Sequence, residues 1–206
     1  MNQLQGKVVL ITGAGRGSGR LLAQAFADRR AIVALNDISP VNVEDVVDEV
    51  ILRGGQARAY IDDVAKKVAV QHIINQVEDD FGRIDILINH AAVEPDIPLL
   101  DMDEWDWHRT LDVNLTGAFL MTQSAGRVMR ARGAGVIINL ISPSIREDVS
   151  GGKAAFLASM AGLARFTRQA AREVSPYGIQ VYSVEDNPEQ VVKAVFALLQ
   201  EQLEER

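Results

Sequence analysis

The sequence predicts a doubly wound α/β fold, in which a parallel sheet of about six strands carries helices on both faces. Three observations predict it. Short runs rich in Val, Ile and Leu alternate with longer segments of helical periodicity along the 206 residues. The runs are apolar without interruption, which is typical of parallel strands buried on both faces. A glycine-rich segment joins the first run to the first helix. This alternation predicts a single domain over residues 1–206.

The expected elements follow from this alternation. Strands are expected at Lys7–Thr12, Ala31–Asn36, Ala57–Ile61, Ile84–Asn89, Gly135–Ile141 and Ile179–Val184. Helices are expected near 17–30, 41–53, 65–82, 103–132 and 152–174. A last helix is expected over Pro188–Leu203, because Asn187 is a suitable N-cap and proline is favoured at the first helical position. No strand pattern follows it, so the sheet is expected to end at its sixth strand.

Composition excludes several classes of function. The formal net charge is −7, so neither nucleic acid nor an anionic membrane is an expected partner. No apolar run approaches the ~20 residues that span a bilayer. The chain has no cysteine, which excludes disulfides and thiol catalysis. Asp101, Asp103 and Glu104 are interpreted as acids at a helix start, and no metal site is expected. The segment MNQLQGKVVLITG lacks the pattern of a signal peptide, so a cytoplasmic location is expected.

The glycine-rich segment TGAGRGSGR, Thr12 to Arg20, connects the first strand directly to a helix. Glycines let the backbone turn tightly and approach a ligand, and the free N–H groups of a helix start attract an anion. The spacing is T-G-x-x-x-G-x-G, so the segment is interpreted as a pyrophosphate site. The alternative is a tight turn with close helix–strand packing. The residues expected at the site are Thr12, Gly13, Gly15, Arg16, Gly17, Ser18 and Gly19.

An acidic residue ends the second strand. Asp37 lies roughly 20 residues past the glycines, where a carboxylate accepts hydrogen bonds from an adenosine ribose. Its charge would repel a 2′-phosphate, so NAD is favoured over NADP as the cofactor, although Arg16 acts weakly in the other direction. The alternative role for Asp37 is a helix or turn cap.

The succession of TGAGRGSG, Asp37, Asp63–Val64 and INHAA at 88–92 resembles the classical short-chain dehydrogenase/reductase family. Its members are Rossmann-fold, NAD(P)-dependent oxidoreductases, and the resemblance extends from Gly6 to about Val184. It implies the strand order 3-2-1-4-5-6. It also implies that Asp63 contacts the adenine and that the backbone of Val64 lies near it.

The family's N-N-A-G stretch appears here as Asn89–His90–Ala91–Ala92, and only its first and third positions match. Asn89 and Ala91 are therefore expected at the cofactor site. His90 could be a ligand or a proton carrier. The favoured interpretation is a loop histidine that faces solvent or caps a strand.

The family resemblance also identifies the reaction centre. Ser142 and Asn114 match the family's catalytic serine and asparagine. Its Tyr-x-x-x-Lys pair falls on the segment KAAFLASMAGLARF, where Phe156 and Met160 stand instead. A phenyl ring has no transferable proton and a thioether has no charge, and losing general acid–base assistance costs about 10²–10⁴-fold in rate. This helix is therefore interpreted as a packing face. Lys153, one turn earlier, is a minor candidate for a substitute cation.

A second departure lies after the sixth strand. The family usually has Pro-Gly there, followed by a mobile helical excursion that covers the substrate. Here Glu185-Asp186-Asn187 leads directly into the last helix, so this lid is expected to be missing.

The sequence therefore predicts a protein that binds NAD(H) through its adenosine half and is catalytically impaired, acting as a non-catalytic or regulatory subunit. A homodimer, or a heterodimer with an active relative, is expected through a helix face with the small residues Ala154, Ala155, Ala158, Ala161 and Gly162. One alternative is an active NAD-dependent oxidoreductase that uses Ser142 and Asn114 with a non-standard proton route. Another is an interaction protein that binds no nucleotide.

Overall fold

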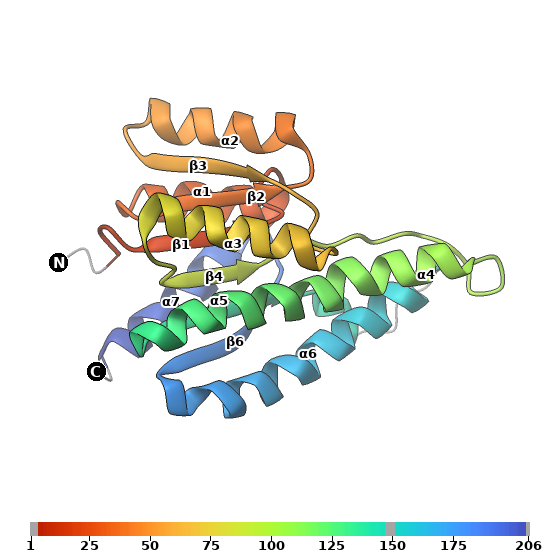
Figure 1. The fold of residues 1–206 in the computed structure, drawn as a ribbon. Coiled ribbons are helices and arrows are strands. Elements are labelled where there is room, and N and C mark those ends of the chain that lie inside the picture. The colour runs from red at the N-terminus through yellow and green to blue at the C-terminus, as the bar shows by residue number, and fades with distance from the viewer. Residues whose placement is uncertain (1–3, 147–150, 205–206) are drawn as a thin grey trace.

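The computed structural model describes residues 4–146 and 151–204, and within them it contains a parallel sheet of six strands in the order β3-β2-β1-β4-β5-β6 (Figure 1). All five neighbouring pairs run parallel. The predicted fold class and strand order are confirmed. The strands are β1 Val8–Thr12, β2 Ile32–Asp37, β3 Gln56–Ile61, β4 Ile86–Asn89, β5 Gly135–Ile141 and β6 Ile179–Glu185.

Helices cover both faces of the sheet and bury two separate apolar cores against it (Figure 1). One face carries α1 (Gly17–Ala27), α2 (Pro40–Leu52) and α7 (Val191–Glu204). The other carries α3 (Lys67–Phe81), α5 (Ala118–Arg132) and α6 (Ala154–Val174). The short helix α4 (Glu104–Leu111) precedes α5. Because all strands are parallel, their carboxyl ends lie on the same side of the sheet, which is where ligands bind in folds of this type.

The two edge strands differ from the interior ones. Every residue of β1 and β4 is buried, whereas β3 and β6 contain several exposed or half-buried positions. The expectation of burial on both faces is thus wrong for β3 and β6. An edge strand has a neighbour on one side only, so fewer helices shield it from solvent.

The helix expected over 103–132 is interrupted. It begins as predicted, because the Asp103 side chain accepts a hydrogen bond from the Asp106 N–H at 2.8 Å. A π-helical turn over Asp112–Gly117 then separates α4 from α5. Such wide turns inside helices occur frequently at functional sites, and this one contains Asn114.

The last helix begins later than predicted. Asn187 caps a turn, since its side-chain oxygen accepts from the Glu189 N–H at 3.0 Å, and its carbonyl accepts from Gln190 and Val191 at 2.9 and 2.7 Å. Pro188 therefore lies in that turn, and the helix starts at Val191. β6 ends at Glu185, so only a short turn connects it to α7, and the missing helical excursion is confirmed.

Candidate functional site

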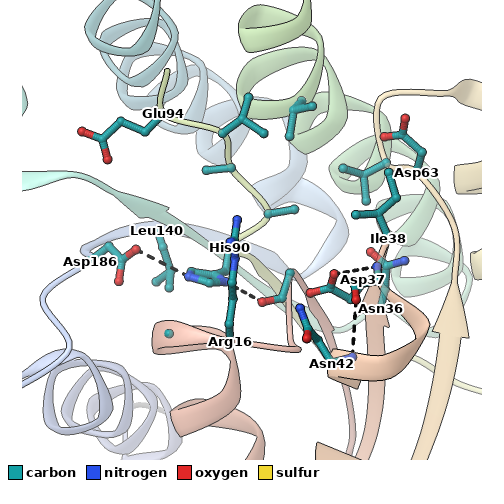
Figure 2. Close-up of a pocket in the computed structure, with 18 of the residues that line it drawn as sticks. Arg16, Asn36, Asp37, Ile38, Asn42, Asp63, His90, Glu94, Leu140 and Asp186 are labelled. Atoms are coloured by element: carbon teal, nitrogen blue, oxygen red, sulfur yellow. Dashed lines mark hydrogen bonds and ion pairs between the residues drawn. The ribbon is translucent and has the colours of Figure 1, made fainter. Parts of the chain in front are cut away.

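A cavity of about 640 Å³ opens at the carboxyl ends of the strands (Figure 2). This volume is within the usual range for sites that hold a small molecule or cofactor. Its wall includes the glycine-rich loop, the ends of β2 and β5, the segment after β4, and one face of α6. Of the residues that the sequence predicted, those lining it are Gly13, Arg16, Gly17, Asp37, Asp63, Val64, Ala91, Ser142, Phe156 and Met160.

The glycine-rich loop is built by close backbone contacts. Gly13 has a φ of +63°, and a Cβ there would lie 2.8 Å from the Ala91 Cα. A Cβ on Gly19 would lie 2.4 Å from the Gly13 carbonyl oxygen. The Thr12 hydroxyl accepts from the backbone N–H groups of His90 and Ala91 at 3.1 and 3.2 Å, which fixes the loop against the segment after β4. The loop therefore admits glycine alone at its closest contacts.

The start of α1 fits an anion. Arg16 occupies its N-cap position in an extended conformation and makes no side-chain cap hydrogen bond. Gly17, the first helical residue, lines the cavity. N–H groups at such a helix start carry a partial positive charge, so this loop can hold a phosphate group. Thr12, Gly15, Ser18 and Gly19 support the loop from behind and do not line the cavity.

Asp37 is a turn cap, which is one of the two roles that the sequence allowed, and it also lines the cavity. Its carboxylate oxygens accept hydrogen bonds from the Gly15 and Ser39 N–H groups, each at 3.0 Å. The side chain thereby caps the turn after β2 and joins it to the glycine-rich loop. Asp37 also lines the cavity, and each carboxylate oxygen keeps a further lone pair for a ligand hydroxyl.

Asp63 has a partner, Arg109, that was not predicted from the sequence. One carboxylate oxygen accepts from the Ala65 N–H at 3.1 Å, and the other pairs with the Arg109 guanidinium at 2.9 Å. Arg109 lies on α4 and lines the same cavity. No local pattern joins residues 46 positions apart, so only the fold reveals this pair.

Asn89 lies inside the sheet and is not a lining residue. Its amide donates to Asn139 Oδ1 at 2.7 Å and to the Thr122 hydroxyl at 3.2 Å, and the side chain is buried. Asn139 in turn donates to the Thr167 hydroxyl at 2.8 Å. These groups form a buried polar network that joins β4 and β5 to α5 and α6.

Phe156 and Met160 present an apolar surface to the cavity. They are 5% and 4% exposed, and they pack with Ala118, Ile141 and Leu163. Ser142 lines the same end of the cavity, and its hydroxyl accepts from the Ser144 N–H at 3.3 Å. The structure thus brings together the positions expected at a reaction centre, with a hydroxyl as the polar member.

Asn114 is bonded inward. Its Oδ1 accepts from the Val93 N–H at 2.8 Å, and its Nδ2 donates to the Val93 carbonyl at 2.9 Å. Nδ2 also donates to the Ser159 hydroxyl at 3.0 Å, which itself donates to the Phe156 carbonyl at 2.7 Å. Asn114 is 1% exposed and does not line the cavity, so its visible role is to join the π-helical turn to α6 and to the segment after β4.

His90 differs from the favoured interpretation of a solvent-facing histidine. Its side chain is only 14% exposed, and Nδ1 lies 2.9 Å from the Gly13 carbonyl oxygen (Figure 2). Nε2 lies 3.6 Å from a carboxylate oxygen of Asp186. Exposure to solvent is thus wrong, because the ring fills the space that the side-chain-free glycines leave beside it. The other alternative, a strand cap, agrees with the contact to Gly13, the residue directly after β1. Lys153, the minor candidate for a cation in the cleft, pairs instead with Glu94 at 3.4 Å.

Residues 4–146 and 151–204 contain neither a metal-binding cluster nor a helix that could span a membrane. No three His, Asp or Glu side chains in these ranges gather closely enough to hold a metal ion. None of the helices described there is long and apolar enough to cross a membrane.

Comparison with known proteins matches residues 7–191 to the family model for short chain dehydrogenases. A 3-oxoacyl-[acyl-carrier-protein] reductase from Synechocystis sp. is 37% identical over 185 residues, which cover 89% of this chain and 74% of the reductase. A metagenomic short-chain oxidoreductase solved with NADP has a TM-score of 0.89 at 30% identity, covering 95% of this chain and 91% of its own. An NAD⁺-bound xylitol dehydrogenase has a TM-score of 0.84 at 32% identity, covering 89% and 70%. With this match, the T-G-x-x-x-G-x-G loop and the strand order, the chain belongs to the short-chain dehydrogenase/reductase family.

Proposed function

We propose that this chain binds NAD(H) through its adenosine half, performs little or no hydride-transfer chemistry by itself, and acts as a non-catalytic or regulatory subunit. One observation carries the proposal: apolar Phe156 and Met160 line the cavity beside Ser142. Hydride transfer to a carbonyl must be accompanied by a proton, and neither side chain can supply one. Met160 also offers no donor to a ribose hydroxyl.

Ser142 is a poor replacement for the lost pair. An isolated hydroxyl becomes a useful acid or base only beside a group that exchanges its proton. Its hydroxyl accepts from the Ser144 N–H, which is a donor and cannot take a proton. The alternative candidate, Asn114, already uses its amide on Val93 and Ser159. An active enzyme would therefore need a proton route through water or the substrate.

We propose NAD as the preferred cofactor. Asp37 places a carboxylate at the end of β2, in the wall of the cavity, where it can accept from ribose hydroxyls. A 2′-phosphate beside it would meet like-charge repulsion. The related structures bind NAD⁺ in one case and NADP in the other, so the preference rests on Asp37 itself.

We also propose a homodimer or a heterodimer with an active relative. A groove of about 350 Å³ between α5 and α6 is lined by Phe119, Phe166 and Tyr177, and Phe119 is 40% exposed. Of the small residues predicted for this interface, Ala158 and Ala161 are exposed on α6. Ala155 is buried within the chain and Gly162 contacts Leu115, so these two do not belong to an outer face. Sedimentation that shows only monomer would refute the dimer.

The test combines binding and turnover. Calorimetric titration with NADH is expected to show binding, and a panel of carbonyl and alcohol substrates is expected to show no turnover at ordinary enzymatic rates. The double variant Phe156→Tyr, Met160→Lys is expected to bind NADH and to gain turnover, because it restores the acid and its neighbouring cation. Substantial turnover by the unmodified chain would overturn the proposed impairment. The lack of any nucleotide binding would instead support an interaction protein.

A further inference from the structure

His90 lies directly against the glycine-rich loop. A Cβ on Gly19 would come within 2.7 Å of its Nδ1, and one on Gly13 within 3.0 Å. A Cβ on Gly17 would lie 3.9 Å from Nε2. The imidazole therefore extends along the loop, from the end of β1 toward the first residue of α1, and it lines the cavity together with Gly13 and Gly17.

The contacts of the ring determine where its hydrogens are. The Gly13 carbonyl oxygen can only accept, so Nδ1 at 2.9 Å carries a hydrogen. Nε2 faces a carboxylate oxygen of Asp186 at 3.6 Å. A bare Nε2 lone pair would be repelled by that carboxylate, whereas a protonated Nε2 is attracted to it.

The Nε2–H is not committed to Asp186. A separation of 3.6 Å is an ion pair and exceeds the range of an N–H···O hydrogen bond. The other oxygen of Asp186 is buried and has no hydrogen-bond partner among the described residues. Asp186 thus compensates the imidazolium charge but leaves the Nε2–H free to donate to a ligand. It follows the last residue of β6, where the family usually has Pro-Gly (Figure 2).

We propose that His90, as an imidazolium supported by Gly13 and Asp186, is a ligand for the diphosphate of the bound nucleotide. The Nε2–H would donate to a phosphate oxygen beside Gly17, where the start of α1 already favours an anion. This inference rests on the proposed nucleotide binding. It makes binding proton-linked, because the complex favours the protonated ring more strongly than the free protein does.

Other charged groups line the same cavity as the ring. Arg16 comes from the same loop as the glycines, Asp37 from the end of β2, Glu94 from the segment after β4, and Asp186 from the end of β6. Of these, Asp186 contacts the ring, at 3.6 Å from Nε2. Affinity is thus expected to be highest at acidic pH and to fall as the pH rises and the ring loses its proton.

The experiment compares two probes, ADP-ribose and adenosine, which differ in the diphosphate. Titration calorimetry between about pH 5.5 and 8.5, in buffers of different ionisation enthalpy, measures both affinity and proton uptake. For the unmodified chain, the dissociation constant for ADP-ribose is expected to rise about tenfold across this range, with proton uptake on binding. Adenosine is expected to bind without either effect.

Three variants separate ligation from support of the loop. His90→Asn is expected to bind ADP-ribose weakly at every pH and without proton uptake, while its adenosine affinity is unchanged. Asp186→Asn leaves the ring in place, and its pH dependence is expected to move to lower pH because the imidazolium has lost its counter-ion. Arg16→Gln is the matched control. It is expected to bind ADP-ribose more weakly at all pH values, while the affinity keeps the same dependence on pH.

The outcomes are distinguishable. If ADP-ribose binds the unmodified chain with an affinity independent of pH and without proton uptake, His90 is only a brace for the loop and the inference is overturned, while the proposed nucleotide binding stands. If neither ADP-ribose nor adenosine binds, both proposals fail. Should His90→Asn be unfolded by circular dichroism, the shift expected in Asp186→Asn decides the matter.

Discussion

The two ends of the cavity have opposite kinds of surface. At the adenosine end, charged groups such as Asp37, Asp63 and Arg16 line the wall. At the reaction end, Phe156 and Met160 line it, while the polar groups of Asn114 and Ser159 bond to neighbouring elements. One family scaffold thus supports a polar ligand surface at one end and an apolar packing surface at the other.

This difference indicates that a position where a polar family residue is replaced says more about function than a position where one is retained. The glycines and Asp37 have structural duties of their own, since Gly19 contacts Gly13 and the Asp37 carboxylate holds the Gly15 N–H. Their presence is explained with or without a nucleotide. Phe156 and Met160 pack in an apolar cluster and cannot transfer a proton, so the impairment that we propose rests on these two positions and not on the retained ones.

Asn114→Leu is expected to have the largest effect, and it tests whether the retained catalytic-type asparagine is structural. Removing the amide leaves the Val93 N–H and carbonyl without their partner in a largely buried position. Each such loss costs about 1–3 kcal/mol, so the free energy of unfolding is expected to fall by about 2–4 kcal/mol. Chemical denaturation measures this change.

The comparison with Ser142→Ala sharpens this result. Ser142 faces the cavity and accepts one hydrogen bond, from Ser144, so its loss is expected to cost less than about 1 kcal/mol. If both variants are equally stable, Asn114 is not the structural connection that its hydrogen bonds indicate.

The sequence predicted the features that local pattern controls. Runs rich in apolar residues located every strand to within two residues, because an interior strand buried on both faces tolerates few polar side chains. The edge strands β3 and β6 were located too, although Arg58 and Gln180 interrupt their runs. The family motif supplied the strand order. The glycine spacing and Asp37 located one wall of the cavity, since these residues follow strands whose carboxyl ends share an edge.

The features that the sequence missed depend on contacts between distant segments. Arg109 meets Asp63, and His90 meets Asp186, only after the strands have assembled. The π-helical turn was also missed, because helical periodicity in the sequence does not reveal one residue inserted into a turn. Burial of β3 was overestimated because the expectation of burial on both faces was applied to all strands alike, although the implied strand order places β3 at an edge.

Gly19→Ala tests the proposed adenosine end, with an expected effect of about 1–3 kcal/mol on nucleotide binding, or about 5- to 150-fold in affinity. The new Cβ would lie 2.4 Å from the Gly13 carbonyl oxygen, which must move and open the loop. NADH titration measures the loss. Gly126→Ala in α5 is the matched control, because a Cβ there meets nothing within 4 Å. Equal NADH affinity in the two variants would show that the loop does not hold the diphosphate.

Asp37→Asn sharpens the cofactor side of the comparison. An amide cannot accept from both Gly15 and Ser39, and it carries no charge to repel a 2′-phosphate. NADH affinity is expected to fall about tenfold, or about 1.4 kcal/mol, and the preference over NADPH is expected to shrink. Asp62→Asn, on a neighbouring carboxylate of the cavity wall, is expected to change the ratio much less. An unchanged ratio in Asp37→Asn would refute the proposed preference.

The smallest expected effect concerns Asp85, which lies at the amino ends of β1 and β4, opposite the cavity, and it separates stability from ligand binding. Burial raises the pKa of the Asp85 carboxyl, but hydrogen bonds from Arg83 and the Val8 N–H, with the charges of Arg83 and Lys7, outweigh it and hold the pKa below its ordinary value. A carboxyl whose pKa is lowered in the folded state adds stability above its unfolded pKa of about 4 and loses it as the pH falls through the folded value.

Asp85→Asn is therefore expected to lower the free energy of unfolding by about 1 kcal/mol at neutral pH. The difference should vanish in strong acid, as measured by urea denaturation across pH, while NADH affinity stays unchanged. If the difference in unfolding free energy is the same at all pH values, the Asp85 contribution does not come from its charge. A change in NADH affinity would mean that the amino and carboxyl ends of the strands are coupled.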